Sequence, residues 1–267
     1  MVKLGKYLTA ILWMITSFEN EAKPAMFETF NFGKCFVQVY KSSSPADEAY
    51  LFLHGFPAVR GKNEDLAEAI AETVDKDVYL IHYEGLGQSK GDFSFSRSIE
   101  ASKDFAEYLL QKNRYQKLHL VGHSWGGLVA VNLKYFLREK IGELIFMAPF
   151  TNLPNEEKAR AILNYTKAEY PNIADHLDVE KLVLELSQIR ENSHPWKIAK
   201  KLDMSPNQIL ILQGLNDDEV EPRDTRYFAE LMPAGSTYIE SDDDHGFSDR
   251  LRLKSTVLGW IEEEGQK

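Results

Sequence analysis

The stretch KLHLVGHSWGGLVAVNLKYF, residues Lys117–Phe136, has two halves of different character. Its first half is rich in leucine and valine, as in a buried strand, and from Leu128 onward the apolar residues recur at helical spacing. Ser124 lies at the junction between Gly122 and Gly126, which lack the Cβ atoms that would collide where a strand and a helix approach closely. The stretch therefore predicts a strand, a sharp turn carrying Ser124, and a helix.

The same alternation of strands and helices runs through most of the chain. Short apolar runs bounded by turn residues are typical of strands covered on both faces, and the segments between them have amphipathic helical periodicity. Such an alternation predicts an α/β fold with a mostly parallel central sheet and helices on both faces. Expected strands lie at 49–54, 77–83, 117–123, 143–149, 207–214 and 236–241, expected helices at 63–74, 98–112, 124–139, 223–232 and 247–264, and a hairpin at 26–41.

The segment 151–205 departs from this alternation. It contains no convincing strand, whereas NEEKARAILNYTKAEY and DVEKLVLELSQI within it have helical periodicity. Unstructured loops of this length are rare inside a compact domain. We therefore expect a core made of residues 27–150 and 206–267, with residues 151–205 inserted as a helical cap over one end of the sheet.

Residues 1–26 form an apolar N-terminal segment with two possible interpretations. Lys3 and Lys6 precede an apolar run too short to span a bilayer, a pattern that resembles a secretory signal peptide and would imply a secreted or periplasmic protein. The same residues place Leu4, Leu8 and Ile11 on one helical stripe. A retained helix of this kind would pack on the body or lie at a membrane surface, in a cytoplasmic or membrane-associated protein. Both interpretations remain open.

The overall composition narrows the classes of function. Among 267 residues, 43% are hydrophobic and 27% charged, an ordinary balance that allows a sizeable core. The net charge of −10, with no offsetting lysine and arginine cluster, argues against nucleic-acid binding. The single cysteine, Cys35, excludes an internal disulfide and a cysteine-based metal cage. The oligomeric state is left open by these data.

Ser124 is the candidate nucleophile. A Gly-x-Ser-x-Gly turn projects its serine oxygen from the carboxyl edge of a sheet, where open α/β sheets bind ligands. The free N–H groups and partial positive charge of the following helix would stabilise an oxyanion formed by serine attack on a carbonyl. The alternative is that the glycines only allow close strand–helix packing.

A serine hydroxyl needs a base, and the base needs an orienting acid. His245, in SDDDHGF after the last predicted strand, is the candidate base. Asp217, three residues after Gly214 and also beyond a strand, is the preferred acid, and Asp218 remains a competitor. The run Asp242–Asp244 is interpreted as mostly solvated, because sequence neighbours seldom direct their side chains at each other across a turn.

These residues resemble the α/β-hydrolase family. The order Ser124, Asp217, His245 matches the family's Ser…Asp/Glu…His order. HGFP, residues 54–57, resembles the family's oxyanion loop, and the resemblance implies that the backbone N–H groups of Phe56 and Trp125 would hold the oxyanion. HYEGLGQSKG resembles the turn after the family's fourth strand, although His82 stands where an aspartate is usual.

The resemblance implies a serine hydrolase of the esterase and lipase branch with a helical cap. Such an enzyme would cleave a small-molecule carboxylic ester through an acyl-enzyme on Ser124, with no metal or cofactor required. A peptidase or thioesterase with the same triad, and a binding protein with an inactive site, are the alternatives. The cap would choose the substrate through apolar residues that otherwise only dock it on the body. These are Leu153, Ile162, Leu163, Tyr165, Tyr170 and Trp196.

Overall fold

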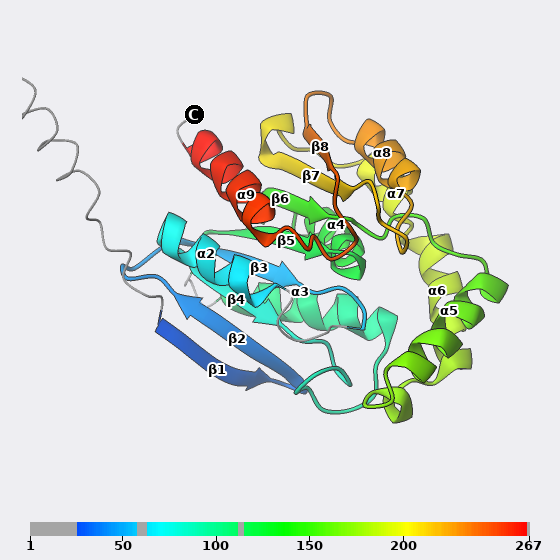
Figure 1. Ribbon diagram of the computed structural model, residues 1–267. Helices are drawn as coiled ribbons and strands as arrows, with labels where there is room; N and C mark the ends of the chain where they lie inside the picture. Colours follow the sequence, from blue (N-terminus) through cyan, green and yellow to red (C-terminus); the bar gives the residue numbers. More distant parts are fainter. Residues whose placement is uncertain (1–25, 58–62, 112–114, 266–267) are drawn as a thin grey trace, which may run out of the picture.

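The computed structural model describes residues 26–57, 63–111 and 115–265 (Figure 1). The expected N-terminal segment therefore lies outside the described residues, except for Met26, which begins the first strand. No described helix is both long enough and apolar enough to cross a membrane.

The described strands form one mixed sheet in the order β1-β2-β4-β3-β5-β6-β7-β8. β2 pairs antiparallel with β1 and β4, and the remaining pairs are parallel. This arrangement confirms the predicted fold class. The strands are β1 (Met26–Phe32), β2 (Cys35–Lys41), β3 (Glu48–Leu53), β4 (Asp77–Ile81), β5 (Lys117–His123), β6 (Ile141–Met147), β7 (Ile209–Gly214) and β8 (Thr237–Ser241).

Helices cover both faces of the sheet (Figure 1). Because successive side chains of a strand point to opposite faces, Tyr79 and Ile81 of β4 enter one apolar cluster, and Val78 and Leu80 enter the other. On the first face lie α3 (Phe95–Gln111), α4 (Trp125–Leu137) and α8 (Pro222–Leu231), and on the second lie α2 (Glu64–Val74) and α9 (Arg250–Gly265).

The residues between β6 and β7 contain helices and no strand (Figure 1). α5 (Glu156–Glu169) and α6 (Val179–Asn192) pack against each other at one end of the sheet. Asn155 and Asp178 begin these helices by accepting hydrogen bonds from the amides of Lys158 and Lys181, at 2.9 and 3.2 Å. The short helix α7 (Pro195–Ala199) instead packs on α4 and α8, so this end of the segment joins the body.

Candidate active site

Ser124 occupies a strained turn between β5 and α4. Its φ of 53° and ψ of −119° are rare for a residue with a side chain. The amide of Ser124 donates to the carbonyl of Met147 in β6 at 2.9 Å, and its carbonyl accepts from Phe150 at 2.8 Å. These bonds to the neighbouring strand and the loop after it hold the turn in its unusual conformation.

The two flanking glycines are required by close backbone contacts. A Cβ on Gly122 would lie 2.5 Å from the carbonyl oxygen of Gly126. A Cβ on Gly126 would collide with the carbonyl of Leu53, at the end of β3. The packing explanation for the glycines is thus correct, and the same packing is what projects Ser124 at the carboxyl edge of the sheet.

Asp217 and His245 come together from two loops at this edge. Nδ1 of His245 lies 2.8 Å from Oδ2 of Asp217, and both side chains are nearly inaccessible to solvent. The other carboxylate oxygen accepts from the amides of Glu219 and Val220, at 2.9 and 2.8 Å, and Gln213 donates to Oδ2 at 3.0 Å. Burial alone would raise the pKa of Asp217, but the hydrogen bond and charge of His245 and these donors hold it below its usual value. Asp217 is therefore suited to orient His245 as an anion.

The structure distinguishes the other acidic residues of these loops. Asp218 is exposed, whereas its neighbour Asp217 points into the protein. The run 242–244 is mostly solvated, as predicted, since Asp242 and Asp244 are exposed, but Asp243 is buried. Its Oδ1 accepts from the amide of Asp244 at 2.9 Å, so this carboxylate stabilises the loop that carries His245.

The side chains of Ser124 and His245, the candidate nucleophile and the candidate base, are not hydrogen-bonded to each other. Among the described residues the hydroxyl of Ser124 has no hydrogen-bonding partner, and Oε2 of Glu219 lies 3.6 Å from Nε2 of His245. The residue before the serine, His123, contacts the backbone of His245, with its Nε2 atom 2.8 Å from the carbonyl oxygen. Hydrogen bonds of catalytic groups are often long or absent without substrate and tighten when it binds.

The predicted oxyanion loop lies against the serine. An ideal Cβ on Gly55 would be 3.1 Å from Cβ of Ser124, so the chain after β3 passes directly over the turn. The amide of Phe56, in this loop, donates to no carbonyl in the described part of the chain. Trp125 is the first residue of α4, where an amide has no partner within the helix. Both amides are therefore available beside Ser124.

Three other histidines, at positions 54, 82 and 119, have neighbours that differ from those of His245. His82 bonds Gln38 through Nε2 at 2.6 Å, and its ring lies 4.6 Å from that of His54. Burial, together with the neighbouring His82 and His123, lowers the pKa of His54 well below its usual value, so His54 is neutral. His119 lies at the opposite edge of the sheet, between Glu48 and Glu143. Within the described residues, no group of three or more His, Cys, Asp or Glu side chains could hold a metal ion.

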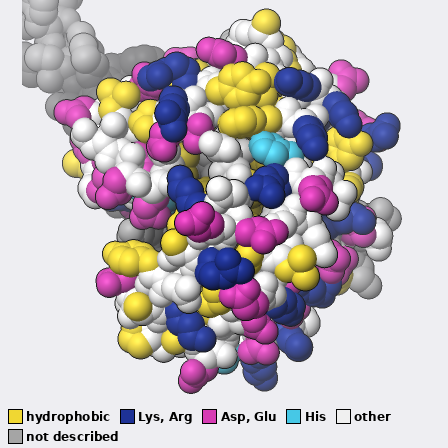
Figure 2. Space-filling model, turned by 90° about the vertical axis from the view of Figure 1, so that its right-hand side faces the viewer, with side chains coloured by type: hydrophobic (Ala, Val, Ile, Leu, Met, Phe, Trp, Pro, Cys, Tyr) yellow, Lys and Arg dark blue, Asp and Glu magenta, His cyan; other side chains and the backbone are white. Residues whose placement is uncertain are grey.

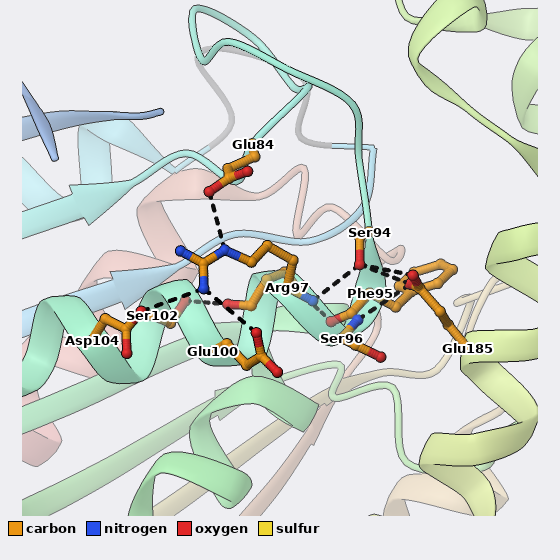
Figure 3. Close-up of polar contacts among 10 residues, drawn as sticks. Glu84, Ser94, Phe95, Ser96, Arg97, Glu100, Ser102, Asp104 and Glu185 are labelled. Carbon is orange, nitrogen blue, oxygen red and sulfur yellow. Dashed lines mark hydrogen bonds and ion pairs between the residues drawn. The ribbon is translucent and has the colours of Figure 1, made fainter. Parts of the chain in front are cut away.

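Glu185 of α6 links the helices between β6 and β7 to α3. Figure 3 shows its carboxylate at the start of α3, where it accepts from the hydroxyl of Ser94 at 2.9 Å and from the amide of Ser96 at 3.3 Å. The first residue of α3, Phe95, lies with its ring 4.4 Å from that of Trp125. A continuous set of contacts therefore joins α6 to the turn beside Ser124, and the sequence did not indicate it.

The candidate substrate residues of the cap divide by exposure. Leu153 and Leu163 are buried in the apolar cluster on the first face of the sheet, whereas Ile162, Tyr165 and Tyr170 are exposed and Trp196 is half-buried. Figure 2, which views this end of the molecule, shows acidic and basic side chains interspersed between apolar patches.

A search of protein-family models matches residues 50–194 to the alpha/beta hydrolase fold. The chain belongs to this family. Among curated proteins it is 26% identical over 146 residues to a putative esterase/lipase of Mycoplasma pneumoniae, and the matched residues cover 51% of this chain and 52% of that protein. It is 25% identical over 181 residues to a coelenterazine h 2-monooxygenase of Renilla reniformis, and the matched residues cover 63% of this chain and 52% of that protein. The chain thus spans about half the length of the curated relatives it matches.

Solved structures of esterases and lipases share the fold. A structure of Est1E from Butyrivibrio proteoclasticus with bound ferulic acid has a TM-score of 0.70 at 16% identity, covering 90% of this chain and 100% of that one. A monoacylglycerol lipase of Paleococcus ferrophilus has a TM-score of 0.65 at 18% identity, covering 89% and 99%. At these identities the likeness establishes the fold alone.

Proposed function

We propose that the protein is a serine hydrolase that cleaves carboxylic esters through an acyl-enzyme on Ser124. The observation that carries this proposal is the 2.8 Å contact of buried Asp217 with Nδ1 of His245, at the sheet edge that also bears the strained serine turn. Nδ1 must carry the proton in this contact, because an ionised carboxylate only accepts. Nε2 is then the basic nitrogen, which is the arrangement that serine activation requires.

The first half of the reaction forms the acyl-enzyme. Nε2 of His245 takes the proton of the Ser124 hydroxyl as its oxygen attacks the ester carbonyl, and Asp217 stabilises the resulting imidazolium. The amides of Phe56 and Trp125 donate to the oxyanion of the tetrahedral intermediate. When that intermediate collapses, the bond to the leaving alcohol breaks and the alcohol takes the proton from Nε2.

The second half releases the acid. Water gives a proton to Nε2 and attacks the acyl carbon, the same amides hold the second oxyanion, and Ser124 leaves with the proton returned by His245. Each group returns to its starting state, and no further reactant is consumed.

The proposal is tested by an ester and amide panel on the wild type and on Ser124→Ala. The panel consists of p-nitrophenyl esters of increasing acyl length, a thioester and a p-nitroanilide. Loss of the serine oxygen should lower ester turnover by several orders of magnitude, as for triads elsewhere. Wild-type turnover of the amide or thioester but not the esters would instead identify a peptidase or thioesterase. Failure of the wild type to react with a fluorophosphonate at Ser124 would favour a binding protein.

A further inference from the structure

His123, the last residue of β5, joins the nucleophile's strand to the backbone of the candidate base. Its side chain is buried, with Nε2 2.8 Å from the carbonyl oxygen of His245 and the two rings 5.0 Å apart. A carbonyl oxygen only accepts hydrogen bonds, so Nε2 of His123 must carry the proton.

Asn63 is placed to support the same tautomer from the other side. This buried residue precedes α2, and its Nδ2 lies 3.4 Å from Nδ1 of His123. An amide N–H donates to an unprotonated ring nitrogen, which is the state of Nδ1 when a neutral imidazole carries its proton on Nε2. Both contacts therefore agree on a neutral His123 that donates to His245.

We propose that His123 is a positioning residue, which fixes the backbone of His245 relative to Ser124 during ester hydrolysis. This inference rests on the proposed function. The Asp217 contact orients the imidazole of His245, but Asp217 lies in the loop after β7 and does not set the distance from His245 to the serine. His123 precedes Ser124 directly in the chain, so its bond to the His245 carbonyl ties the base to the same strand that carries the nucleophile.

A structural alternative is that the ring of His123 only fills space. The ring lies 6.4 Å from that of Phe247 and 5.0 Å from that of His245, so it contributes packing as well as a hydrogen bond. Packing depends on the volume of the side chain, whereas positioning depends on a donor at the place of Nε2. Two uncharged amide substitutions, together with His123→Met, separate these roles, because methionine has nearly the volume of glutamine but carries no N–H donor.

His123→Gln and His123→Asn form the matched pair. The longer glutamine can place an amide N–H near the position of Nε2, while asparagine reaches only the position of Nδ1. Since a misplacement of about 1 Å can cost about a hundredfold in rate, we expect kcat of His123→Asn to fall about tenfold to a hundredfold, with KM nearly unchanged. His123→Gln should recover at least about half of that loss on a logarithmic scale, whereas His123→Met, which fills the same space without a donor, should not.

A measurement without turnover accompanies the kinetics. The Nδ1 proton of His245, hydrogen-bonded to Asp217, should give a low-field NMR signal in the wild type and in His123→Gln. In His123→Asn the signal should broaden through faster exchange with water, because the loop that holds His245 has lost its bond to β5. ¹⁵N spectra of the wild type should show His123 protonated at Nε2.

Several outcomes would overturn the inference. These are equal loss of kcat in the two amide variants, recovery of kcat by His123→Met equal to that by His123→Gln, an unchanged His245 signal in His123→Asn, or a wild-type His123 protonated at Nδ1. Failure of the proposed function is recognised separately, by equal ester turnover in the wild type and Ser124→Ala. The NMR comparison then decides alone whether His123 holds His245 in place.

Discussion

Asp217 and His245 are 28 residues apart in the sequence and are joined by a hydrogen bond of 2.8 Å at the carboxyl edge of the sheet. Asp218, the next residue, is exposed. The contrast between these two neighbouring aspartates provides a matched pair of variants for the first prediction.

Asp217→Asn should lower kcat of ester hydrolysis by about three to four orders of magnitude, because an amide no longer selects the productive tautomer of His245. Asp218→Asn makes the same chemical change one residue away and should leave kcat nearly unchanged. Steady-state kinetics on one ester, with circular dichroism to verify folding, checks both. A larger loss in Asp218→Asn than in Asp217→Asn would contradict the assignment of the acid.

Glu219 places a negative charge at the mouth of the candidate site, with Oε2 3.6 Å from Nε2 of His245. The leaving group must approach this nitrogen to take its proton. Glu219→Gln should therefore raise kcat/KM for an ester with an anionic leaving group, relative to a neutral ester, because it removes the repulsion between two negative charges. The expected increase is only about threefold, since solvent weakens the effect of an exposed charge.

The control for this effect is Asp218→Asn, which removes the same charge from the same loop at an exposed position. Competition kinetics between the two esters should be measured at low salt and with 0.5 M added salt, where the Debye length is roughly 4 Å. The gain of Glu219→Gln for the anionic ester over the neutral one should become smaller at high salt. Equal preferences in the two variants would show that Glu219 does not act on the leaving group.

Glu185 should contribute to stability and to substrate binding through its contacts at the start of α3. Glu185→Ala removes an acceptor for the hydroxyl of Ser94 and the amide of Ser96, and should lower the free energy of unfolding by about 1–3 kcal/mol. Since the contacts lead through Phe95 to Trp125, KM should rise more than kcat falls.

Glu180→Ala, on the same helix, is the control. Glu180 pairs with Arg160 at 2.8 Å on the exposed surface, where ion pairs contribute little. Urea unfolding should therefore show no measurable change for this variant. A similar destabilisation in both variants would mean that the buried contacts of Glu185 have no special role.

His119 should make stability depend on pH at the edge of the sheet opposite the candidate site. Burial alone would lower the pKa of His119, but hydrogen bonds with Glu143 and Glu48 outweigh it and raise the pKa. A raised pKa means that the folded state binds the proton more tightly than the unfolded state. The stabilisation is then complete below the unfolded value of 6.5 and disappears as pH rises through the folded value.

The loss of stability in His119→Gln, relative to the wild type, should consequently be larger at pH 5.5–6 than at pH 9. Urea unfolding measures it across this pH interval, which brackets roughly the usual pKa of histidine. The pH dependence that Glu48 contributes to stability has the opposite sign, because the hydrogen bond from His119 lowers the pKa of Glu48 to about 2. Its contribution is present at all the pH values of this experiment and does not obscure the trend. A difference between the two proteins that is constant with pH would refute the linkage.

The features that the sequence predicted well are those determined by local sterics. Gly122 must leave room for the backbone of Gly126 and Gly127, which follow it closely in the chain, so its place before Ser124 indicated the sharp turn without knowledge of the fold. The alternation of apolar runs likewise predicted the sheet and its two helical layers. These patterns depend on neighbours in the chain.

The features that the sequence did not predict depend on contacts between distant loops. The sequence left Asp218 as a competitor of Asp217, because the choice depends on His245, which comes from a loop 28 residues further along the chain. The expected start of α3 at residue 98 was late by three residues. The hydroxyl of Ser94 accepts from the amide of Arg97 at 3.0 Å and itself donates to Glu185 of α6, far away in sequence.

The central claim is that Ser124 carries the acyl group, and mass spectrometry tests it most directly. The protein is mixed with an excess of a p-nitrophenyl ester, quenched in acid during the first turnovers, and digested. We predict one acyl group per chain, on the peptide containing Ser124, and none on the Ser124→Ala protein. An acyl group on a different residue, or undiminished hydrolysis by Ser124→Ala, would contradict the account.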